Sequence, residues 1–336
     1  MQAIFERLAQ GRTLTRDEAR ETMGVIMDGQ ATPSQIGGLV MALRVRGETV
    51  QELTGFAEAM RARAATVPVT RRPVLETCGT GGDGSHSLNV STLAGLVAAG
   101  AGVAVAKNGN RSVSSRSGSA DVLEALGIPI PQTAEEAARQ VDEVGFGFLY
   151  APLLHASMRH AGPTRKELGV RTVFNLLGPL TNPAGAEHQL LGVFQASWVE
   201  PVARVLAELG TRHSLVVHGE GLDEATLGGD TLVAEVREGA VTTYTLTPEE
   251  LNIPRAPQAA IRGGGPDENA RRGEAVLAGA QGPDADIIVL NAGLALYAAD
   301  VVDNVRDGVA EARRAIRSHR AIEVLSELRA WREVPA

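Results

Sequence analysis

The chain has 336 residues, enough for two domains, and its hydrophobic fraction of 44% is that of an ordinary soluble globular protein. Acidic residues outnumber basic ones by 40 to 32 and aromatic residues make up only 3%, which argues against a general nucleic-acid binder and a base-stacking surface. The single cysteine, Cys78, permits no intrachain disulfide, and we expect a cytoplasmic protein without a signal peptide or membrane-spanning helix.

The N-terminal part of the chain is expected to form helices only. Three capping boxes mark helix starts, namely Thr15–Glu18, Thr32–Gln35 and Thr49–Glu52. In each box the threonine can accept from the amide three residues on, while the Glu or Gln side chain reaches back to the cap. Gly29 and Gly47 stand where the first two of these helices should end. We therefore assign residues 1–70 to a small all-helical domain, which runs into a linker at residues 66–73.

Beyond the linker, short apolar runs alternate with helical stretches. The strands expected there are Pro73–Cys78, Gly102–Ala106, Ser214–Gly219 and Asp286–Gly293. This alternation indicates an α/β domain with a mainly parallel sheet over residues 71–336. The alternating stretch 232–246 adds one antiparallel hairpin, and the tail Val305–Trp331 adds one or two amphipathic helices. A polar helical stretch over about 151–175 breaks this rhythm and is a candidate to pack on the helical domain.

A glycine-rich loop, "GTGGDG" from Gly79 to Gly84, follows the first expected strand. Glycines allow backbone N–H groups to turn toward an oxyanion, since no Cβ blocks the approach. We expect Ser91 to cap the next helix, whose positive end would then face the same anion. The spacing matches neither the Rossmann nor the Walker loop, and a tight strand-to-helix turn is the alternative interpretation.

Two further segments follow expected strands, where ligands bind in open α/β sheets. The stretch "KNGNRSVSSRSGS", Lys107 to Ser119, offers Lys107, Arg111 and several serines to phosphate oxygens, although a solvated loop is the alternative. Asp223 and Glu224 could hold Mg²⁺ together with substrate phosphates, although most adjacent carboxylates are surface features. The seven histidines form no recognisable metal constellation, and no Ser–His–Asp arrangement is evident.

Six motifs carry a resemblance to a known family. "GTGGDG", "NVST", "KNGNRS", "SGSADVLEALG", "RTVFNLLGPLTNP" and "GLDE" stand in the order and spacing of the anthranilate phosphoribosyltransferases, and the resemblance covers nearly the whole chain. It implies transfer of the phosphoribosyl group of phosphoribosyl pyrophosphate to anthranilate, in tryptophan biosynthesis. It also implies a nucleoside phosphorylase-like fold, with a small helical domain, a larger α/β domain and a homodimer formed through the helical domain.

The resemblance also implies a set of site residues by motif position. Those around phosphoribosyl pyrophosphate are Gly79, Gly82, Asp83, Ser87, Asn89, Val90, Ser91, Thr92, Lys107, Asn108, Gly109, Asn110, Arg111, Ser112, Val113, Ser114, Ser115 and Ser119. Those around anthranilate are Gly79, Asn110, His155, Arg165 and Gly178. Ser91, Asp223 and Glu224 would hold two Mg²⁺ ions per subunit. No general base is expected, because an aromatic amine is already neutral at pH 7.

The chain departs from the family pattern at two places. Asn108 stands where the family usually has histidine, and "HASM" at His155–Met158 stands where "HPAM" is usual. We expect position 108 to act mainly through its backbone, so that asparagine can replace histidine there. Two alternatives remain open: a pyrimidine nucleoside phosphorylase-like enzyme, which would not need the acidic pair, and a non-catalytic nucleic-acid-binding relative, which the net charge of −8 opposes. No nucleic-acid or membrane partner is expected.

Overall fold

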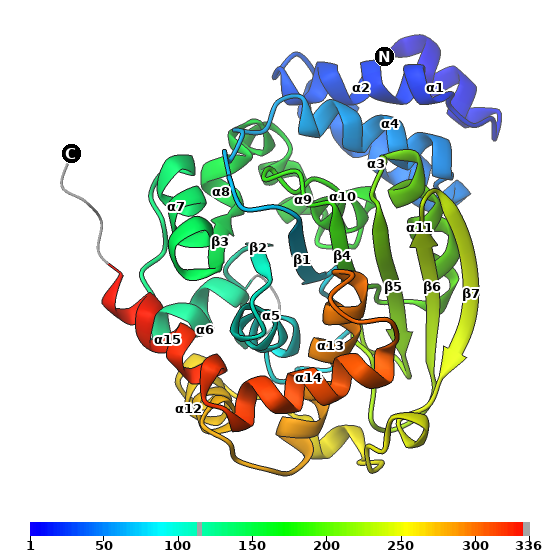
Figure 1. Ribbon diagram of the computed structural model, residues 1–336. Helices are drawn as coiled ribbons and strands as arrows, with labels where there is room; N and C mark the ends of the chain where they lie inside the picture. The colour runs from blue at the N-terminus through cyan, green and yellow to red at the C-terminus, as the bar shows by residue number, and fades with distance from the viewer. Residues whose placement is uncertain (113–115, 332–336) are drawn as a thin grey trace.

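The computed structural model describes residues 1–112 and 116–331. Four helices, α1 (Gln2–Ala9), α2 (Arg16–Met27), α3 (Pro33–Arg46) and α4 (Val50–Arg61), form a separate layer at the top of Figure 1. The three predicted capping boxes are confirmed. In each, the threonine side chain accepts from the amide three residues on, and the Glu or Gln side chain at that position accepts from the threonine amide. Gly47 caps the end of α3, and Gly29 follows the end of α2 with a left-handed φ of 72°.

The larger domain is built on one seven-stranded sheet with the strand order β3-β2-β1-β4-β5-β6-β7. The strands are β1 (Val74–Gly79), β2 (Ala104–Gly109), β3 (Phe146–Tyr150), β4 (His188–Gly192), β5 (His213–Gly219), β6 (Thr231–Arg237) and β7 (Ala240–Leu246). The strands β1 to β5 pair in parallel, whereas β6 and β7 form an antiparallel hairpin at the edge. The expected α/β fold with a mainly parallel sheet and one hairpin is therefore confirmed.

Helices cover both faces of this sheet. They are α5 (Val90–Gly100), α6 (Ser119–Ala125), α7 (Ala134–Val144), α8 (Ala151–Leu154), α9 (Gly162–Leu168), α10 (Val173–Leu177), α11 (Val199–Glu208), α12 (Pro266–Leu277), α13 (Pro283–Ala298), α14 (Val305–Arg317) and α15 (Arg320–Ala330). Short 3₁₀ turns are η1 (Ala156–His160), η2 (Gly178–Leu180), η3 (Ala196–Trp198), η4 (Glu249–Leu251) and η5 (Gln258–Ile261). The predicted C-terminal amphipathic helices are α14 and α15, which lie across the lower front of Figure 1.

The two sheet faces belong to different hydrophobic cores. Leu215 and Val217 of β5 pack with α5 and α13 to α15, while Val216 faces the opposite way. Val216 joins a core that also contains buried residues of α2 to α4 and of α11, so the helical domain and this face of the sheet share their apolar contacts. The segment from η1 to α10 also packs there: Ala161 is buried in the same core, and α9 contacts α3.

One predicted strand is wrong. Asp286–Gly293 lies inside the helix α13, whose residues 287–296 are all buried. A helix that is apolar on every side shows no 3.6-residue period, so its Ile and Val run resembles a buried strand. Conversely, β3 and the central strand β4 were missed, because the prediction relied on Val and Ile runs and "FGFLY" and "HQLLG" contain neither residue.

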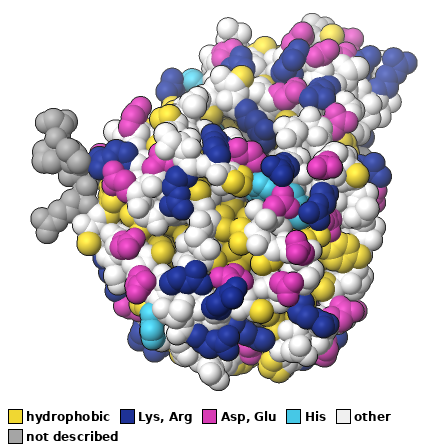
Figure 2. Space-filling model, in the orientation of Figure 1, with side chains coloured by type: hydrophobic (Ala, Val, Ile, Leu, Met, Phe, Trp, Pro, Cys, Tyr) yellow, Lys and Arg dark blue, Asp and Glu magenta, His cyan; other side chains and the backbone are white. Residues whose placement is uncertain are grey.

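On the face drawn in Figure 2, basic and acidic side chains lie interspersed. Within the part of the chain that the structure describes, no helix combines the length and the apolar character that crossing a membrane requires.

Candidate functional site

Three segments meet at the carboxyl ends of the parallel strands. The glycine loop follows β1, the polar loop follows β2 and the acidic pair follows β5. Although β4 separates β1 from β5, Gly81 N–H donates to Asp223 Oδ2 at 2.6 Å. Ser91 N–H donates to Glu224 Oε1 at 3.0 Å, and Lys107 Nζ donates to Ser91 Oγ at 3.1 Å. The structure therefore brings together the segments that the sequence analysis singled out.

The glycine loop has the geometry of an anion-binding loop. Gly81, Gly82 and Gly84 have left-handed φ values of 69°, 75° and 78°. The amides of Gly82, Asp83 and Gly84 donate to no acceptor within residues 1–112 and 116–331, so they are available to a ligand. Gly79 allows a second close approach, because a Cβ at this position would overlap the Asp223 carboxylate. Successive free amides of this kind form a concave site for phosphate oxygens.

The start of α5 differs from the prediction. The helix begins at Val90 with Asn89 as its N-cap, so Ser91 is not the capping residue. The Asn89 side chain makes no cap bond, because it donates to Ser117 O at 3.2 Å and accepts from Asn269 Nδ2 at 2.9 Å. The carboxylate of Glu224 instead accepts from the Ser91 amide in the first turn, where the helix dipole favours negative charge.

The acidic pair is not a solvated surface feature. Glu224 is only 7% exposed, and burial raises its pKa to about 7, against the opposing effect of Lys107. Burial, together with the nearby carboxylates of Asp83 and Glu224, raises the pKa of Asp223 well above its ordinary value. Asp223 N–H also donates to Asp83 Oδ2 at 3.3 Å. Three carboxylates thus lie together, two of which interact with the ammonium of Lys107, and this excess of hard oxygen ligands fits a divalent cation such as Mg²⁺.

Lys107 lies in the sheet and not in a polar loop, which corrects the sequence interpretation. The strand β2 continues through Lys107 and Asn108 to Gly109, and Lys107 is only 2% exposed. The strands β1 and β2 pair only at Val74 and Leu75, beyond which Lys107 Nζ donates to Thr77 O at 2.6 Å. The ammonium therefore binds a carbonyl of β1 on one side and Ser91 on the other. Burial lowers its pKa, while the neighbouring carboxylates oppose this shift.

The loop after β2 folds onto α6 in this structure. Arg111 pairs with Glu124 at 2.6 Å, so its guanidinium faces the helix and not the glycine loop. Ser119 begins α6, and its hydroxyl accepts from the Asn110 amide at 3.2 Å. Ser112 N–H donates to Asp121 Oδ2 at 2.9 Å. Val113, Ser114 and Ser115, which the resemblance placed around phosphoribosyl pyrophosphate, lie outside the described residues.

Three further residues that the resemblance places around phosphoribosyl pyrophosphate, Ser87, Val90 and Thr92, lie around the start of α5. Ser87 forms an isolated antiparallel bridge with Arg262, which fixes the end of the glycine loop. Val90 and Thr92 are both 1% exposed, so at these positions the first turn of α5 faces the core. Any contact of Val90 with a ligand would therefore be made through its backbone.

Three of the five predicted anthranilate residues, His155, Arg165 and Gly178, lie on the segment from α8 to η2. The Arg165 guanidinium lies 5.1 Å from the centroid of the Phe174 ring, and burial lowers its pKa. No carboxylate pairs with it in the described part of the chain, so it is open to an anionic ligand. His155 is buried, its Nε2 atom has no partner there, and burial lowers its pKa to about 4, which keeps the ring neutral at pH 7.

Asn108 reaches the acceptor segment through its side chain. Its Nδ2 atom donates to Gly178 O at 3.4 Å, whereas its Oδ1 atom is buried without a partner among the described residues. The side chain therefore makes a contact that the sequence interpretation, based on the backbone alone, did not include. The bond is long, so its contribution should be small.

The sequence analysis missed three residues that support these segments. Glu76 is fully buried in β1, accepts from Gln189 at 3.0 Å, and has its pKa raised to about 8 by burial. Asn269 of α12 holds the Asn89 side chain, and the Arg171 guanidinium donates to Gly82 O. A carboxylate inside the apolar strand "PVLETC" was a signal for Glu76. Arg171 opens the motif "RTVFNLLGPLTNP", but its contact with Gly82, like that of Asn269 with Asn89, joins residues too distant in sequence for a local pattern to indicate.

The structure also brings two histidines together in a separate cluster. His188 and His213 begin β4 and β5 and so lie at the amino-terminal ends of these strands, opposite the glycine loop. With Asp300 they offer ligand atoms within 4.8 Å of one another. The ring of His188 donates Nδ1–H to Ala298 O at 2.6 Å, since a carbonyl can only accept. That nitrogen consequently has no lone pair for a metal.

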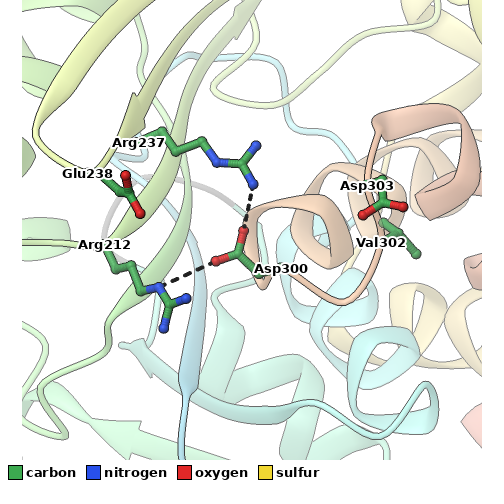
Figure 3. A pocket seen from close by; sticks show the side chains of 6 residues that line it. All are labelled: Arg212, Arg237, Glu238, Asp300, Val302 and Asp303. Carbon is green, nitrogen blue, oxygen red and sulfur yellow. Dashed lines mark hydrogen bonds and ion pairs between the residues drawn. The ribbon is translucent and has the colours of Figure 1, made fainter.

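The other members of this cluster are also engaged. Asp300 accepts from His213 Nδ1 at 2.7 Å and lies 3.6 Å from Arg212 and 3.5 Å from Arg237 (Figure 3). His213 Nε2 lies 3.1 Å from Glu235 Oε1. Figure 3 shows both arginines directed toward Asp300. The three residues line a cavity of about 220 Å³. We interpret the cluster as an ion-pair and hydrogen-bond network that connects the strands at this end of the sheet to Asp300, just beyond α13.

Family models match both parts of the chain. The model described as "Glycosyl transferase family, helical bundle domain" matches residues 2–64, and "Glycosyl transferase family, a/b domain" matches residues 71–322. Together with the anion-binding loop and the buried carboxylates, these matches define a glycosyltransferase of the type that combines a helical bundle with an α/β domain.

Individual relatives narrow this class. The chain is 53% identical to the anthranilate phosphoribosyltransferase of Symbiobacterium thermophilum, covering 98% of this chain and 97% of that one. It superposes with a TM-score of 0.92 on the crystal structure of the Thermus thermophilus enzyme, at 49% identity and with 97% and 98% of the two chains covered. The chain belongs to the anthranilate phosphoribosyltransferase family.

A more distant relative was solved with ligands. The Saccharomyces cerevisiae anthranilate phosphoribosyltransferase in complex with PRPP and Mg superposes with a TM-score of 0.87, at 27% identity and with 96% and 95% of the chains covered.

Proposed function

We propose that this protein transfers the phosphoribosyl group of phosphoribosyl pyrophosphate to the amine of anthranilate, giving N-(5-phosphoribosyl)anthranilate and pyrophosphate in tryptophan biosynthesis. One observation carries this proposal: a loop with free amides and a buried acidic pair meet at one edge of the sheet. An unpaired guanidinium, that of Arg165, lies on the acceptor segment. The relatives described above bear the same activity in their names, and the nucleoside phosphorylase-like and nucleic-acid-binding alternatives are not favoured.

The donor side of the site follows from the local chemistry. The amides of the glycine loop would bind the pyrophosphate oxygens, and the residues that the family resemblance places around phosphoribosyl pyrophosphate would line the rest. Ser91, Asp223 and Glu224 would hold Mg²⁺, as two ions per subunit, and Mg²⁺ bound there would neutralise the charge that develops on the leaving pyrophosphate. A structure of the yeast relative in complex with PRPP and Mg supports the binding of phosphoribosyl pyrophosphate and Mg²⁺.

The acceptor side requires recognition more than activation. Arg165 would bind the anthranilate carboxylate through its planar guanidinium, with Gly79, Asn110, His155 and Gly178 around the ring. His155 is neutral at pH 7, so it would not repel a positively charged ribose in the transition state. A structure of the yeast relative in complex with 4-fluoroanthranilate supports an aromatic acceptor of this kind. No side chain is required as a general base, because the amine of anthranilate is already neutral.

The function has a direct test. Anthranilate fluorescence should fall when the protein, phosphoribosyl pyrophosphate and Mg²⁺ are combined, and pyrophosphate should be released in equal amount. Unchanged fluorescence with folded protein would contradict the proposal. A homodimer formed through the helical domain, and a domain boundary between residues 70 and 71, remain predictions that sedimentation and limited proteolysis can address.

Arg165→Ala is expected to weaken the use of anthranilate far more than that of phosphoribosyl pyrophosphate. Loss of one charge-assisted hydrogen bond costs about 1.5–3 kcal/mol, or about 10- to 150-fold in kcat/KM for anthranilate. Steady-state kinetics with each substrate varied in turn measure the effect. Arg159→Ala is the matched control, because Arg159 is exposed on the same segment. Equal losses for both substrates would mean that Arg165 does not contact the acceptor.

Asn108→His is expected to change kcat/KM for either substrate by less than about tenfold, or 1.4 kcal/mol. The reason is that the Asn108 side chain makes only one long bond, to Gly178 O, which a histidine N–H can replace. The same kinetic measurements apply. A gain much larger than tenfold would show that the histidine usual in the family has a side-chain role that this protein lacks.

A further inference from the structure

Arg171 connects the acceptor segment to the glycine loop. It lies between α9 and α10, just beyond the helix that carries Arg165. Its guanidinium donates to Gly82 O and stacks on Phe194, at 4.7 Å from the ring centroid. The amide of Phe194 donates to Thr80 Oγ1 at 3.0 Å, so the surface on which Arg171 rests is itself bound to the loop. No carboxylate pairs with Arg171 within the described ranges.

The bond to Gly82 O determines how the neighbouring amide points. The carbonyl of Gly82 and the N–H of Asp83 belong to one planar peptide unit and point in opposite directions. Holding the carbonyl therefore directs the Asp83 amide away from Arg171, and this amide has no acceptor among the described residues. A glycine-rich loop has many alternative conformations, so such contacts are needed to select one of them.

The loop has a second contact of this type on its other side, where Gly81 N–H donates to Asp223. Arg171 packs closely enough that a Cβ at Gly82 would lie 3.2 Å from its Nε atom. The loop is thus held between the acidic pair and a cation from the acceptor segment.

We propose that Arg171 is a positioning residue that fixes the glycine loop in its anion-binding conformation and links this loop to the acceptor segment. The part of this proposal that concerns catalysis rests on the proposed function. The guanidinium acts through the backbone of Gly82, and the expected consequence is that an ordered acceptor segment favours binding of the phosphorylated donor.

Amide hydrogen exchange of the full-length protein, without substrates, tests the positioning itself. In the wild type the amides of Gly81, Ser85 and Ser87 are bonded and should be protected. Arg171→Gln should abolish this protection, whereas Lys166→Gln, which removes an exposed charge from the neighbouring helix, should leave it unchanged. Unaltered protection of residues 80–88 in Arg171→Gln would overturn the proposal, and this result does not depend on whether the protein turns over anthranilate.

Kinetics test the consequence for the reaction. Arg171→Gln should raise KM for phosphoribosyl pyrophosphate by about tenfold or more, the effect of losing one charge-assisted hydrogen bond. KM for anthranilate at saturating donor should change much less, and Arg171→Lys should recover part of the loss, since an ammonium can still donate to Gly82 O. An unchanged KM for the donor, or equal effects from Lys166→Gln, would contradict the proposal. Inactivity of the wild type would instead refute the proposed function and leave the exchange experiment to decide the role of Arg171.

Discussion

Replacement of the acidic pair, Asp223→Asn with Glu224→Gln, is expected to lower turnover at low Mg²⁺ by about a hundredfold or more, since a bound metal contributes several kcal/mol to charge stabilisation. The two carboxylates are buried beside Asp83, where they would repel pyrophosphate unless a cation lies between them. High Mg²⁺ should restore activity only in part, because the glycine loop and Lys107 still bind the donor while the metal binds weakly. A Mg²⁺ titration of the rate measures this.

The matched control removes two carboxylates elsewhere. Glu238→Gln with Asp303→Asn has the same change of charge, but both residues are exposed at the cavity on the opposite edge of the sheet. This control should titrate with Mg²⁺ as the wild type does. Circular dichroism verifies folding of both variants. Superimposable Mg²⁺ curves for the acidic-pair variant and the wild type would show that the pair holds no metal.

Lys107→Met is expected to lower the free energy of unfolding by about 3–5 kcal/mol. Removal of the buried ammonium leaves the buried carboxylates beside it without a positive charge to compensate them. The ammonium binds Thr77 O and Ser91 Oγ and lowers the pKa of Glu224. The carboxyl group of Glu224 has a folded-state pKa of about 7, above its ordinary 4.5, so it costs stability as the pH rises through this range. Without Lys107 this pKa rises further, and the loss should be larger at pH 8 than at pH 6.

Urea denaturation at the two pH values, with and without Mg²⁺, measures the effect. Mg²⁺ should return part of the lost stability, because a divalent cation can supply the missing positive charge. Lys166→Met serves as the control, since Lys166 is exposed and should change stability by less than about 0.5 kcal/mol. A loss for Lys107→Met as small as that of the control would mean that the ammonium contributes little to the folded state.

The features of the fold that could be predicted from the sequence were those that depend on residues close together along the chain. The capping boxes at Thr15, Thr32 and Thr49 depend only on residues three positions apart, and all three formed. The start of α5 could not be derived in this way, because the Asn89 side chain is taken by Ser117 and Asn269, which lie far along the chain. Burial on every side likewise made α13 resemble a strand, and the short β4 carried too few β-branched residues to be recognised.

The composition of the site was easier to predict than its architecture. Glycines followed by an acidic pair indicated anion and metal chemistry, and the structure places them together. The sequence pattern placed Lys107 in a polar, anion-binding loop, whereas the separation of β1 from β2 beyond Leu75 creates a buried position for its ammonium within the sheet. Arg171 and Glu76 were missed because their importance depends on contacts with Gly82 and Gln189 that only the folded chain makes.

The two halves of the site are attached to the scaffold in different ways, and this has an evolutionary consequence. The proposed donor half is made from strand ends and the first turn of α5, where Lys107 binds a carbonyl of β1 and Glu224 binds an amide of the helix. The proposed acceptor half is carried mainly by α8 to η2, a segment that contributes no strand to the sheet. Selection for a new nucleophile can therefore act mainly on this segment apart from Arg171, whose bond to Gly82 O serves the glycine loop, while recognition of a phosphorylated sugar depends chiefly on the strand ends.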